Sequence, residues 1–550
     1  MNKLIITLLC LIVLFSFGLR FYKVSEVPPS LNWDEASIGY NAYSILKTGK
    51  DEWGKLLPLH FRSYGEYKLP VQVYASIPGI AIFGLNEFGV RITPVVYGAL
   101  TVLILFFLVR ELFKSYWIGL FSSLLLAISP WHIQLTRGSF ESAFACFWVV
   151  LGIWFLVKGF KDPKWWIVAM IPLALSVYTY NTARVFTPVF LLLVAVIYHK
   201  DIQKQIRHFL ISLTIFTILM IPLLFFLLSG EGNSRYKLVS VTDDPGLVLR
   251  INEQRGLSNL PGPLPRLVHN KVSYVAKAVI GNYLAHFTPD FLFISGAPHK
   301  QHHVQKIGQL YLYQAPFLLL GLLYLFKARH KFRWLLVTWP LLTFFPVAFT
   351  NDSIPNALRS LIAAPFYQII TGVGLYNAFV WIRKRSCPAF YISAFVMATV
   401  AITTFILYFR NYLFIYPLEY SRDWQYGNKQ AVETIKQNYD KYDLIVFSRH
   451  YGEPHMFTLF FTTYDPARFF NDPRLTRFET YDWVRVVKFD KFYFPDLGDK
   501  GTKFDDIVSK NPGKRILFIG IPGDFPSSIT PIKKVDFLNG NHAFEIIEVM

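Results

Sequence analysis

Two adjacent carboxylates, Asp34 and Glu35, are the residues of this sequence best suited to acid–base chemistry. They stand in PPSLNWDEASIGYNAYSI, shortly after an apolar run over 3–20. Acids beside a bilayer cost free energy unless they are paired or functional, so this position predicts a functional site. A structural interpretation is equally open, because Asn32 can cap a helix and a first turn favours Asp and Glu.

The cations that an anionic substrate would need lie in the same loop and in shorter ones. Lys68 follows Glu66 in SYGEYKLP. Three short loops add one arginine each: Arg137 in SPWHIQLTRGSFES, Arg184 in YTYNTARVFTP and Arg359 in NDSIPNALRS. A lysine at such an edge often reaches toward headgroups, and an arginine often pairs with an acid, here Glu141 or Asp352. Together these cations predict a site for a lipid phosphate.

Other side chains are candidates for contacts with an acceptor or a sugar. Trp33, Tyr40 and Tyr180 could stack on a sugar ring, although aromatic belts at the interface explain such residues equally well. Glu66 lies beside Lys68, and His286 and Asp290 are four residues apart, a spacing that shares one face of a helix.

The histidines of the loop over 230–310 raise the question of a metal. The loop contains His269, His286, His299, His302 and His303. Imidazole is a common zinc ligand, but this spacing fits no compact ligand set. We therefore expect no metal cofactor, with a divalent cation as the alternative. Cys10, Cys146 and Cys387 are isolated and indicate neither disulfides nor zinc.

The elements that must position these residues belong to a membrane protein. Of 550 residues, 53% are hydrophobic and only 17% are charged, which excludes a cytosolic multidomain enzyme and a disordered chain. A span needs about 17–25 predominantly apolar residues. We predict a polytopic α-helical protein with about 11 transmembrane helices, at 3–20, 91–109, 115–130, 139–158, 165–180, 185–199, 209–229, 311–327, 333–349, 358–382 and 389–409.

The orientation follows from the basic residues. The segment 70–84 is apolar but only about 15 residues long, which favours an interfacial helix. With that choice the basic clusters all fall on one side: Arg110/Lys114, Lys158/Lys161/Lys164, Lys200/Lys204/Arg207, Lys327/Arg329/Lys331/Arg333 and Arg383/Lys384/Arg385. The positive-inside rule places that side and the N-terminus in the cytoplasm of a multi-pass plasma-membrane protein. The net charge of +19 then marks topology and predicts no nucleic-acid partner.

The domain organisation follows from the same topology. Residues 1–410 form a transmembrane module with outer loops at 21–90 and 230–310. Residues 411–550 change composition, with a polar helical run over 427–438 and apolar strand-like runs at 444–447, 515–521 and 543–549. This pattern predicts a soluble, extracytoplasmic C-terminal α/β domain.

Several motifs resemble one enzyme family. NWDEASIGYNAY, GEYKLPVQVY and FGLNEFGVRITPVVYGALTVLILFFLVRELF are similar to segments of the polyprenyl-phosphate-sugar-dependent glycosyltransferases of the GT-C fold. This family includes the protein O-mannosyltransferases and the lipid A aminoarabinose transferases. The likeness covers about residues 1–410. It implies that Asp34 is the general base and that Lys68 binds the donor phosphate, although the motif here reads K-L-P rather than K-P.

The resemblance implies an inverting enzyme that moves a single sugar from a polyprenyl-phosphate donor to an extracytoplasmic acceptor, which is a protein Ser/Thr, a glycan or a lipid. Glu35 would orient the acceptor or tune Asp34. Two other functions stay open, a lipid-linked-sugar flippase and a non-catalytic polysaccharide-binding assembly protein. Transporters place ionisable residues near the midplane, whereas these acids lie in an outer loop, which favours an enzyme.

Overall fold

The computed structural model describes residues 1–229, 232, 234–244, 246–480, 483–498 and 501–549. The chain forms two compact units. The helical unit contains Met1–Tyr22, Pro94–Thr136 and Phe140–Phe409, and the loop-and-sheet unit contains Lys23–Thr93, Arg137–Ser139 and Arg410–Met550. The loop that carries Asp34 therefore packs with the C-terminal residues of the chain.

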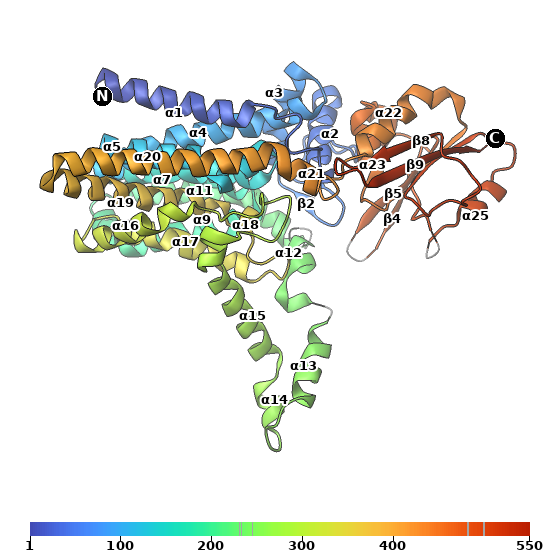
Figure 1. The fold of residues 1–550 in the computed structure, drawn as a ribbon. Coiled ribbons are helices and arrows are strands. Elements are labelled where there is room, and N and C mark those ends of the chain that lie inside the picture. Colours follow the sequence, from blue (N-terminus) through green and yellow to red (C-terminus); the bar gives the residue numbers. More distant parts are fainter. Residues whose placement is uncertain (230–231, 233, 245, 481–482, 499–500, 550) are drawn as a thin grey trace. The chain divides into compact units, whose positions relative to one another are not determined.

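Apolar helices lying side by side build the helical unit (Figure 1). They are α1 (Lys3–Phe21), α4 (Glu87–Phe113), α5 (Tyr116–Ala127), α6 (Pro130–Arg137), α7 (Glu141–Gly159), α8 (Lys164–Val177), α9 (Asn181–Ile197), α11 (Ile206–Leu228), α16 (Ala315–Lys327), α17 (Arg333–Ala348), α19 (Ala364–Arg385) and α20 (Cys387–Arg410). Each of the predicted spans falls on one of these helices or on a consecutive pair, so the polytopic helical class is confirmed.

Fewer helices are long enough to span a membrane than the eleven that the sequence predicted. Within the described residues, six helices are long and apolar enough to cross a membrane, or seven if α5 and α6, bent by 56°, form one span. The predicted spans at 165–180, 185–199, 311–327 and 333–349 form shorter apolar helices, and α8, α9 and α17 contain internal prolines. The count of eleven is therefore not confirmed.

A buried arginine holds the bend between α5 and α6. The Arg20 guanidinium donates to the carbonyl oxygen of Ala127 at 3.0 Å, to Thr136 Oγ1 at 2.9 Å and to Ser16 Oγ at 2.8 Å. Carbonyl groups at a helix C-terminus have no partner within the helix. Arg20 supplies one at the end of α5, which explains how a charged side chain is accommodated within this apolar unit.

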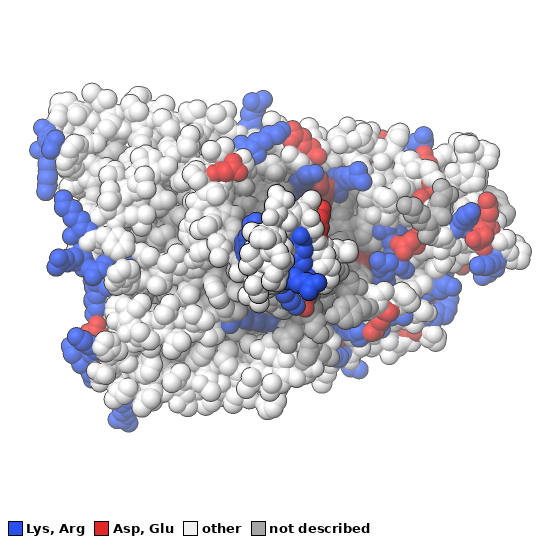
Figure 2. All heavy atoms as spheres, turned by 90° about the horizontal axis from the view of Figure 1, so that it is seen from below, with Lys and Arg blue, Asp and Glu red and all other residues white. Residues whose placement is uncertain are grey.

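The predicted basic clusters meet at one end of the helical unit, where Figure 2 shows blue side chains gathered along one edge. Glu111 bridges Lys114 at 2.6 Å and Lys161 at 2.8 Å, and Lys331 pairs with Asp201 at 3.0 Å. These contacts join four connections that are far apart in sequence. We call this end the basic edge.

The predicted outer loop over 230–310 contains helices of its own. They are α12 (Ser234–Val239), α13 (Leu247–Gly256), α14 (Leu264–Val268) and α15 (Lys271–Ala285). Residues 230, 231, 233 and 245 of this predicted loop lie outside the described residues.

The loop-and-sheet unit combines the first loop with a seven-stranded mixed sheet of order β4-β5-β6-β3-β7-β9-β8. Its strands are β3 (Leu444–Phe447), β4 (Thr476–Glu479), β5 (Val484–Phe489), β6 (Phe492–Tyr493), β7 (Ile516–Gly520), β8 (Lys533–Asp536) and β9 (His542–Val549), with α22 at Asn428–Asn438 and α23 at Pro454–Phe461. The predicted helix and all three predicted strands are confirmed.

One apolar core joins the loop to the sheet. From the loop, α2 (Trp33–Thr48) and α3 (Pro70–Phe83) pack together, and Gly39 of α2 lies against the Phe460 ring of α23. Tyr40 and Ala36 of α2 are buried in the same hydrophobic cluster as Phe447 and Phe460. The loop is thereby held on a rigid support.

Candidate active site

The two neighbouring carboxylates lie at the start of α2, in the capped first turn that the sequence suggested. Asn32 Oδ1 accepts a hydrogen bond from Glu35 N at 2.8 Å, and Glu35 Oε2 accepts one from Asn32 N at 3.1 Å. Successive residues on a helix point about 100° apart. The side chains of Asp34 and Glu35 therefore lie in different environments: Asp34 is partly exposed, whereas Glu35 is buried.

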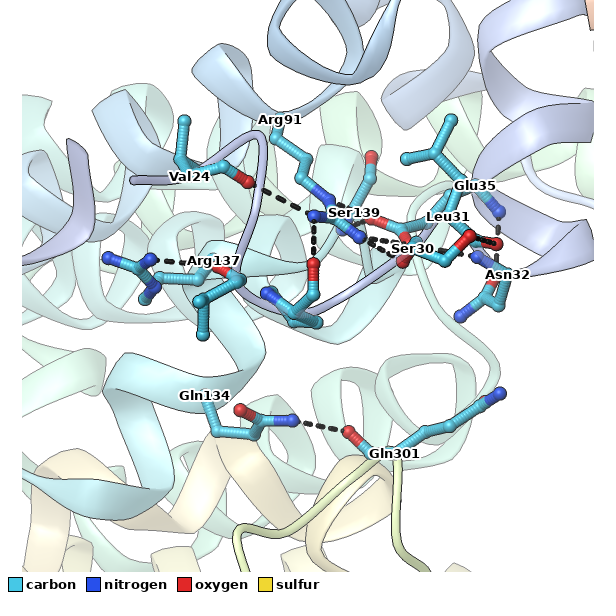
Figure 3. A network of polar contacts seen from close by, with 12 residues as sticks. Val24, Ser30, Leu31, Asn32, Glu35, Arg91, Gln134, Arg137, Ser139 and Gln301 are labelled. Atoms are coloured by element: carbon cyan, nitrogen blue, oxygen red, sulfur yellow. Dashed lines mark hydrogen bonds and ion pairs between the residues drawn. The ribbon is translucent and has the colours of Figure 1, made fainter. Parts of the chain in front are cut away.

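Glu35 is fully buried and saturated with hydrogen bonds (Figure 3). Arg91 donates to it through Nε at 2.9 Å and Nη2 at 3.0 Å, and Ser139 N donates at 2.9 Å. The Arg91 guanidinium also donates to the carbonyl oxygens of Val24 and Pro28. This bidentate pair ties the loop to the start of α4. The Glu35 carboxylate is therefore occupied in holding α2, and its role in catalysis stays a prediction.

Asp34 is 38% exposed and forms an ion pair with the buried ammonium of Lys68, with Oδ1 and Nζ 2.6 Å apart. Lys68 ends a two-stranded hairpin of β1 (Phe61–Arg62) and β2 (Tyr67–Lys68), and Pro70 begins α3 two residues later. Glu66 Oε1 lies 3.8 Å from the same Nζ. The structure thus brings together the predicted base, the predicted phosphate ligand and Glu66.

Trp33, the neighbour of Asp34, is held by residues close to the sheet. Trp33 N donates to Gln425 Oε1 at 2.9 Å, and Tyr64 Oη donates to the Trp33 carbonyl oxygen at 2.9 Å. Gly452 follows β3 and touches the Trp33 ring so closely that an added Cβ would lie 2.2 Å from it. Trp483, next to β5, packs edge-on to the Trp33 ring. The C-terminal domain therefore sets the position of the first turn of α2.

This contact leads to a first prediction. If Asp34 is the predicted base, Gly452→Ala should lower the turnover number about tenfold or more, because displacing Trp33 moves Asp34 and small misplacements of a base are costly. Gly452 has φ of +115°, so the alanine also adds backbone strain. Gly523→Ala is the matched control, since Gly523 has φ of +98° with open space around its Cα. Equal activity losses in the two variants would exclude a specific role for the Trp33 contact.

A second buried acid, Glu52, lies in the same loop. Its carboxylate accepts a hydrogen bond from Asn41 Nδ2 at 3.2 Å. Burial raises the pKa of Glu52 to about 7, although the charge of Arg477 opposes the rise. The Arg477 guanidinium stacks over the Trp53 ring at 3.9 Å and donates to the Glu52 carbonyl oxygen. Glu52 therefore changes charge near neutral pH at the junction of loop and sheet.

The raised pKa predicts a pH-dependent stability. Between pH of about 4.5 and 7 the folded chain binds a proton at Glu52 that the unfolded chain releases, so the free energy of unfolding falls as pH rises through this window. Glu52→Gln should remove that loss and stabilise the protein above pH 7 by roughly 3 kcal/mol. Thermal unfolding of both proteins across this range measures it. Parallel curves for the two proteins would contradict the prediction.

Two other predicted residues of this unit are buried in its core. Tyr40 is fully buried and its hydroxyl donates to the Tyr464 carbonyl oxygen at 3.2 Å, and its contact with a sugar stays a prediction. Arg137 is also fully buried. It donates to the Val27 carbonyl oxygen at 2.8 Å and stacks over the Tyr412 ring at 5.2 Å, so it takes part in the packing around the loop, and its role as a phosphate ligand stays a prediction.

In the helical unit, Arg359 realises the structural alternative that the sequence left open. Its guanidinium pairs with Asp352 Oδ2 at 2.8 Å and donates to Thr350 Oγ1 at 2.9 Å. Arg184 is half-buried on α9 and stacks over the Phe226 ring at 5.6 Å, while Tyr180 directly precedes α9.

His286 and Asp290 do not share a face as their spacing suggested, because α15 ends at Ala285. The buried His286 ring accepts a hydrogen bond from Asn356 N at 3.0 Å, and burial lowers the pKa of His286 to about 4. Asp290 is exposed, and its carboxylate accepts from Ser295 Oγ at 2.7 Å. Among the described residues, no cluster of three or more His, Cys, Asp or Glu side chains is arranged as a metal site.

Sequence reasoning missed the partners that hold the site. Arg91, Glu52, Gln425 and Gly452 were not singled out. Arg91 follows the start of α4 in a segment that reads as an ordinary span boundary, and Gln425 and Gly452 lie nearly 400 residues or more from Trp33. The position of Gly452, directly before Glu453-Pro454, was the one signal available in the sequence.

Part of the chain matches a known protein family. Residues 70–226 match the family model described as dolichyl-phosphate-mannose-protein mannosyltransferase. The match contains Arg91, Arg137 and Arg184 and begins two residues after Lys68. No curated protein matches this chain in sequence.

Solved structures share the fold. The apo form of ArnT from Cupriavidus metallidurans has a TM-score of 0.56 at 11% identity, over 99% of this chain and 97% of that chain. The same protein bound to undecaprenyl phosphate has a TM-score of 0.54 at 11% identity, over 98% of this chain and 97% of that chain. The apo form of the Archaeoglobus fulgidus oligosaccharyltransferase has a TM-score of 0.53 at 13% identity, over 83% of this chain and 63% of that chain.

This chain therefore spans less than two thirds of the length of the archaeal enzyme and nearly the whole of ArnT. At such identities the likeness shows the fold alone, which is the multi-span GT-C architecture with a C-terminal sheet domain. The sequence match over α3 to α11 adds a likeness to the mannosyltransferase family within residues 70–226. The chain therefore has the GT-C fold, and its matched segment and loop motifs resemble the polyprenyl-phosphate-sugar-dependent glycosyltransferases.

Proposed function

We propose that this enzyme moves a single sugar, with inversion, from a polyprenyl-phosphate donor to an extracytoplasmic acceptor, with Asp34 as the general base and Lys68 as a ligand of the donor phosphate. The observation that carries the proposal is the pairing of a partly exposed carboxylate with a buried ammonium at 2.6 Å. Asp34 is the more accessible partner, since its side chain is 38% exposed and that of Lys68 is 3% exposed.

The chemistry requires little beyond these two charges. The acceptor oxygen attacks the anomeric carbon, its proton passes to the Asp34 carboxylate, and the bond between the anomeric carbon and the phosphate oxygen breaks with its electrons leaving on the phosphate. The positive charge of Lys68 stabilises the departing phosphate. Attack opposite the leaving group inverts the anomeric configuration. Glu35 and Arg91 hold α2 so that Asp34 keeps its position during the reaction.

The relatives support the choice of substrate classes. ArnT from Cupriavidus metallidurans has been solved with undecaprenyl phosphate, and the Archaeoglobus fulgidus oligosaccharyltransferase with a tethered acceptor peptide. We infer a polyprenyl-phosphate donor for this chain, and a protein Ser/Thr, a glycan or a lipid as acceptor. Arg184 stays a candidate for an additional phosphate contact, whereas the Arg359 guanidinium is already paired with Asp352.

The basic edge supports the orientation. We place it in the cytoplasm of a multi-pass plasma-membrane protein, with the N-terminus on the same side. Asp34 and the C-terminal domain then face the outside, where a sugar carried by a lipid is available as donor.

A reconstituted assay tests the function. Proteoliposomes carrying a radiolabelled polyprenyl-phosphate sugar should release free polyprenyl phosphate only when acceptor is present, and NMR of the product should show the inverted anomer. Lys68→Met should lose donor consumption, whereas Lys429→Met, at the partly exposed pair with Glu87, should retain it. Movement of donor between leaflets without product would instead establish a flippase, and binding without either would establish an assembly protein.

A further inference from the structure

A helical arm, residues 247–285, projects sideways from the helical unit (Figure 1). It consists of α13, a turn containing SNLPGPLP, the short α14, and α15. None of the proposed chemistry uses it. Its surface and its point of attachment nevertheless indicate what it contacts.

The root of the arm is attached to the C-terminal end of α17. Asn282 Nδ2 donates to the carbonyl oxygens of Ala348 at 3.1 Å and Thr350 at 2.8 Å. The Tyr283 hydroxyl donates to the Leu341 carbonyl oxygen at 3.1 Å. The N-terminal end of α17, beginning at Arg333, belongs to the basic edge. The arm therefore leaves the helical unit along the half of α17 away from the basic edge and runs across the direction of the helices (Figure 1).

Large apolar side chains cover the arm without being buried. Val272 is 78% exposed and Leu257 is 76% exposed. The others exposed on the arm are Val248, Leu249, Leu260, Leu264, Leu267, Val268, Ile280 and Leu284. Four of these leucines lie within twelve residues of the tip. An apolar surface of this extent is unusual for a segment in water and marks a binding surface.

The charge of the arm is positive. It carries five basic residues and one acid, Glu253, so its net charge is 5 − 1 = +4. Arg250 is paired with Asp244 at 2.6 Å, and Arg255 donates to the His269 carbonyl oxygen at 2.7 Å. Arg266, Lys271 and Lys277 are exposed and make no ion pair with any described residue. These three cations are available to an external anion.

We propose that the arm is a membrane-surface anchor that lies on anionic phospholipid headgroups at the end of the helical unit away from the basic edge. Exposed leucine and valine side chains beside lysine and arginine side chains that form no ion pair are typical of a segment at the boundary between lipid headgroups and acyl chains. The apolar groups enter the boundary, and Arg266, Lys271 and Lys277 meet lipid phosphates. A soluble protein partner would account less well for apolar side chains and cations that are spread over the whole arm.

The test measures where the tip lies. An environment-sensitive dye is attached at Leu267→Cys after Cys10 and Cys387, the two exposed cysteines, are replaced by serine; Cys146 is buried and stays. A dye at Ser528→Cys, exposed on the C-terminal domain, is the control. In nanodiscs containing phosphatidylglycerol we expect spin-labelled lipid to quench the dye at 267, and iodide to quench the dye at 528.

The charge is tested in the same system. Replacing Arg266, Lys271 and Lys277 by glutamine should reduce lipid quenching at 267 to the level found without phosphatidylglycerol. Quenching by iodide at both positions, in every lipid composition, would overturn the anchor. Protection of the dye that appears only on adding acceptor would also overturn it, and would make the arm an acceptor contact. If lipid quenching at 267 were the same with and without the three glutamine substitutions, the role of anionic lipid would be overturned.

Discussion

Asp34→Asn should lower the rate of sugar transfer by about 10²- to 10⁴-fold, the usual contribution of a general base. Asparagine matches the carboxylate in shape but cannot accept the proton of the acceptor hydroxyl. The variant keeps Lys68, whose ammonium lies 2.6 Å from Asp34 Oδ1, so the donor phosphate should still bind. Single-turnover release of polyprenyl phosphate, with donor binding measured separately, distinguishes the two effects.

Glu66→Gln is the matched control for that variant, because Glu66 is the second carboxylate near Lys68, at 3.8 Å. We expect only a small change in turnover from it. If Asp34→Asn retained near-normal turnover while Glu66→Gln lost it, Glu66 rather than Asp34 would be the base. Loss of donor binding in Asp34→Asn would show instead that Asp34 orients the lysine.

Arg91→Met should destabilise the loop-and-sheet unit by about 3–5 kcal/mol, since it leaves the Glu35 carboxylate buried and unpaired. Both side chains are fully buried, and the guanidinium also donates to three carbonyl oxygens of the chain leading into α2. Thermal unfolding of the purified protein in detergent measures the loss. Activity per folded molecule should fall far less than it does in Asp34→Asn.

A partly exposed pair provides the control for this prediction. Lys429 and Glu87 lie 2.6 Å apart, with side chains 41% and 13% exposed. Lys429→Met should cost no more than about 1 kcal/mol, because solvent screens the pair. A variant of Arg91 with normal stability and abolished turnover would contradict the structural role of Glu35 and restore it as a catalytic residue.

The helical scaffold could be predicted because span length and apolar content are local properties. The helices over 3–21 and 206–228 are recognisable from composition alone. Their number could not be settled in the same way, because α8, α9 and α17 are short and contain proline. In the C-terminal region the apolar runs predicted β3, β7 and β9, but the short or polar strands β4, β6 and β8 depend on pairing with neighbours.

In the candidate site, too, some features could be predicted from the sequence and others depend on the tertiary structure. By itself the sequence determined that Asp34 and Glu35 follow the first span, that Asn32 can cap their helix, and that Lys68 precedes a proline-started helix. Only the tertiary structure decided that Glu35 turns inward to Arg91 while Asp34 meets Lys68, and that residues near 425 and 452 hold Trp33. The reason is physical: capping and span length depend on neighbours in the chain, whereas burial and ion pairing depend on residues that only folding brings together.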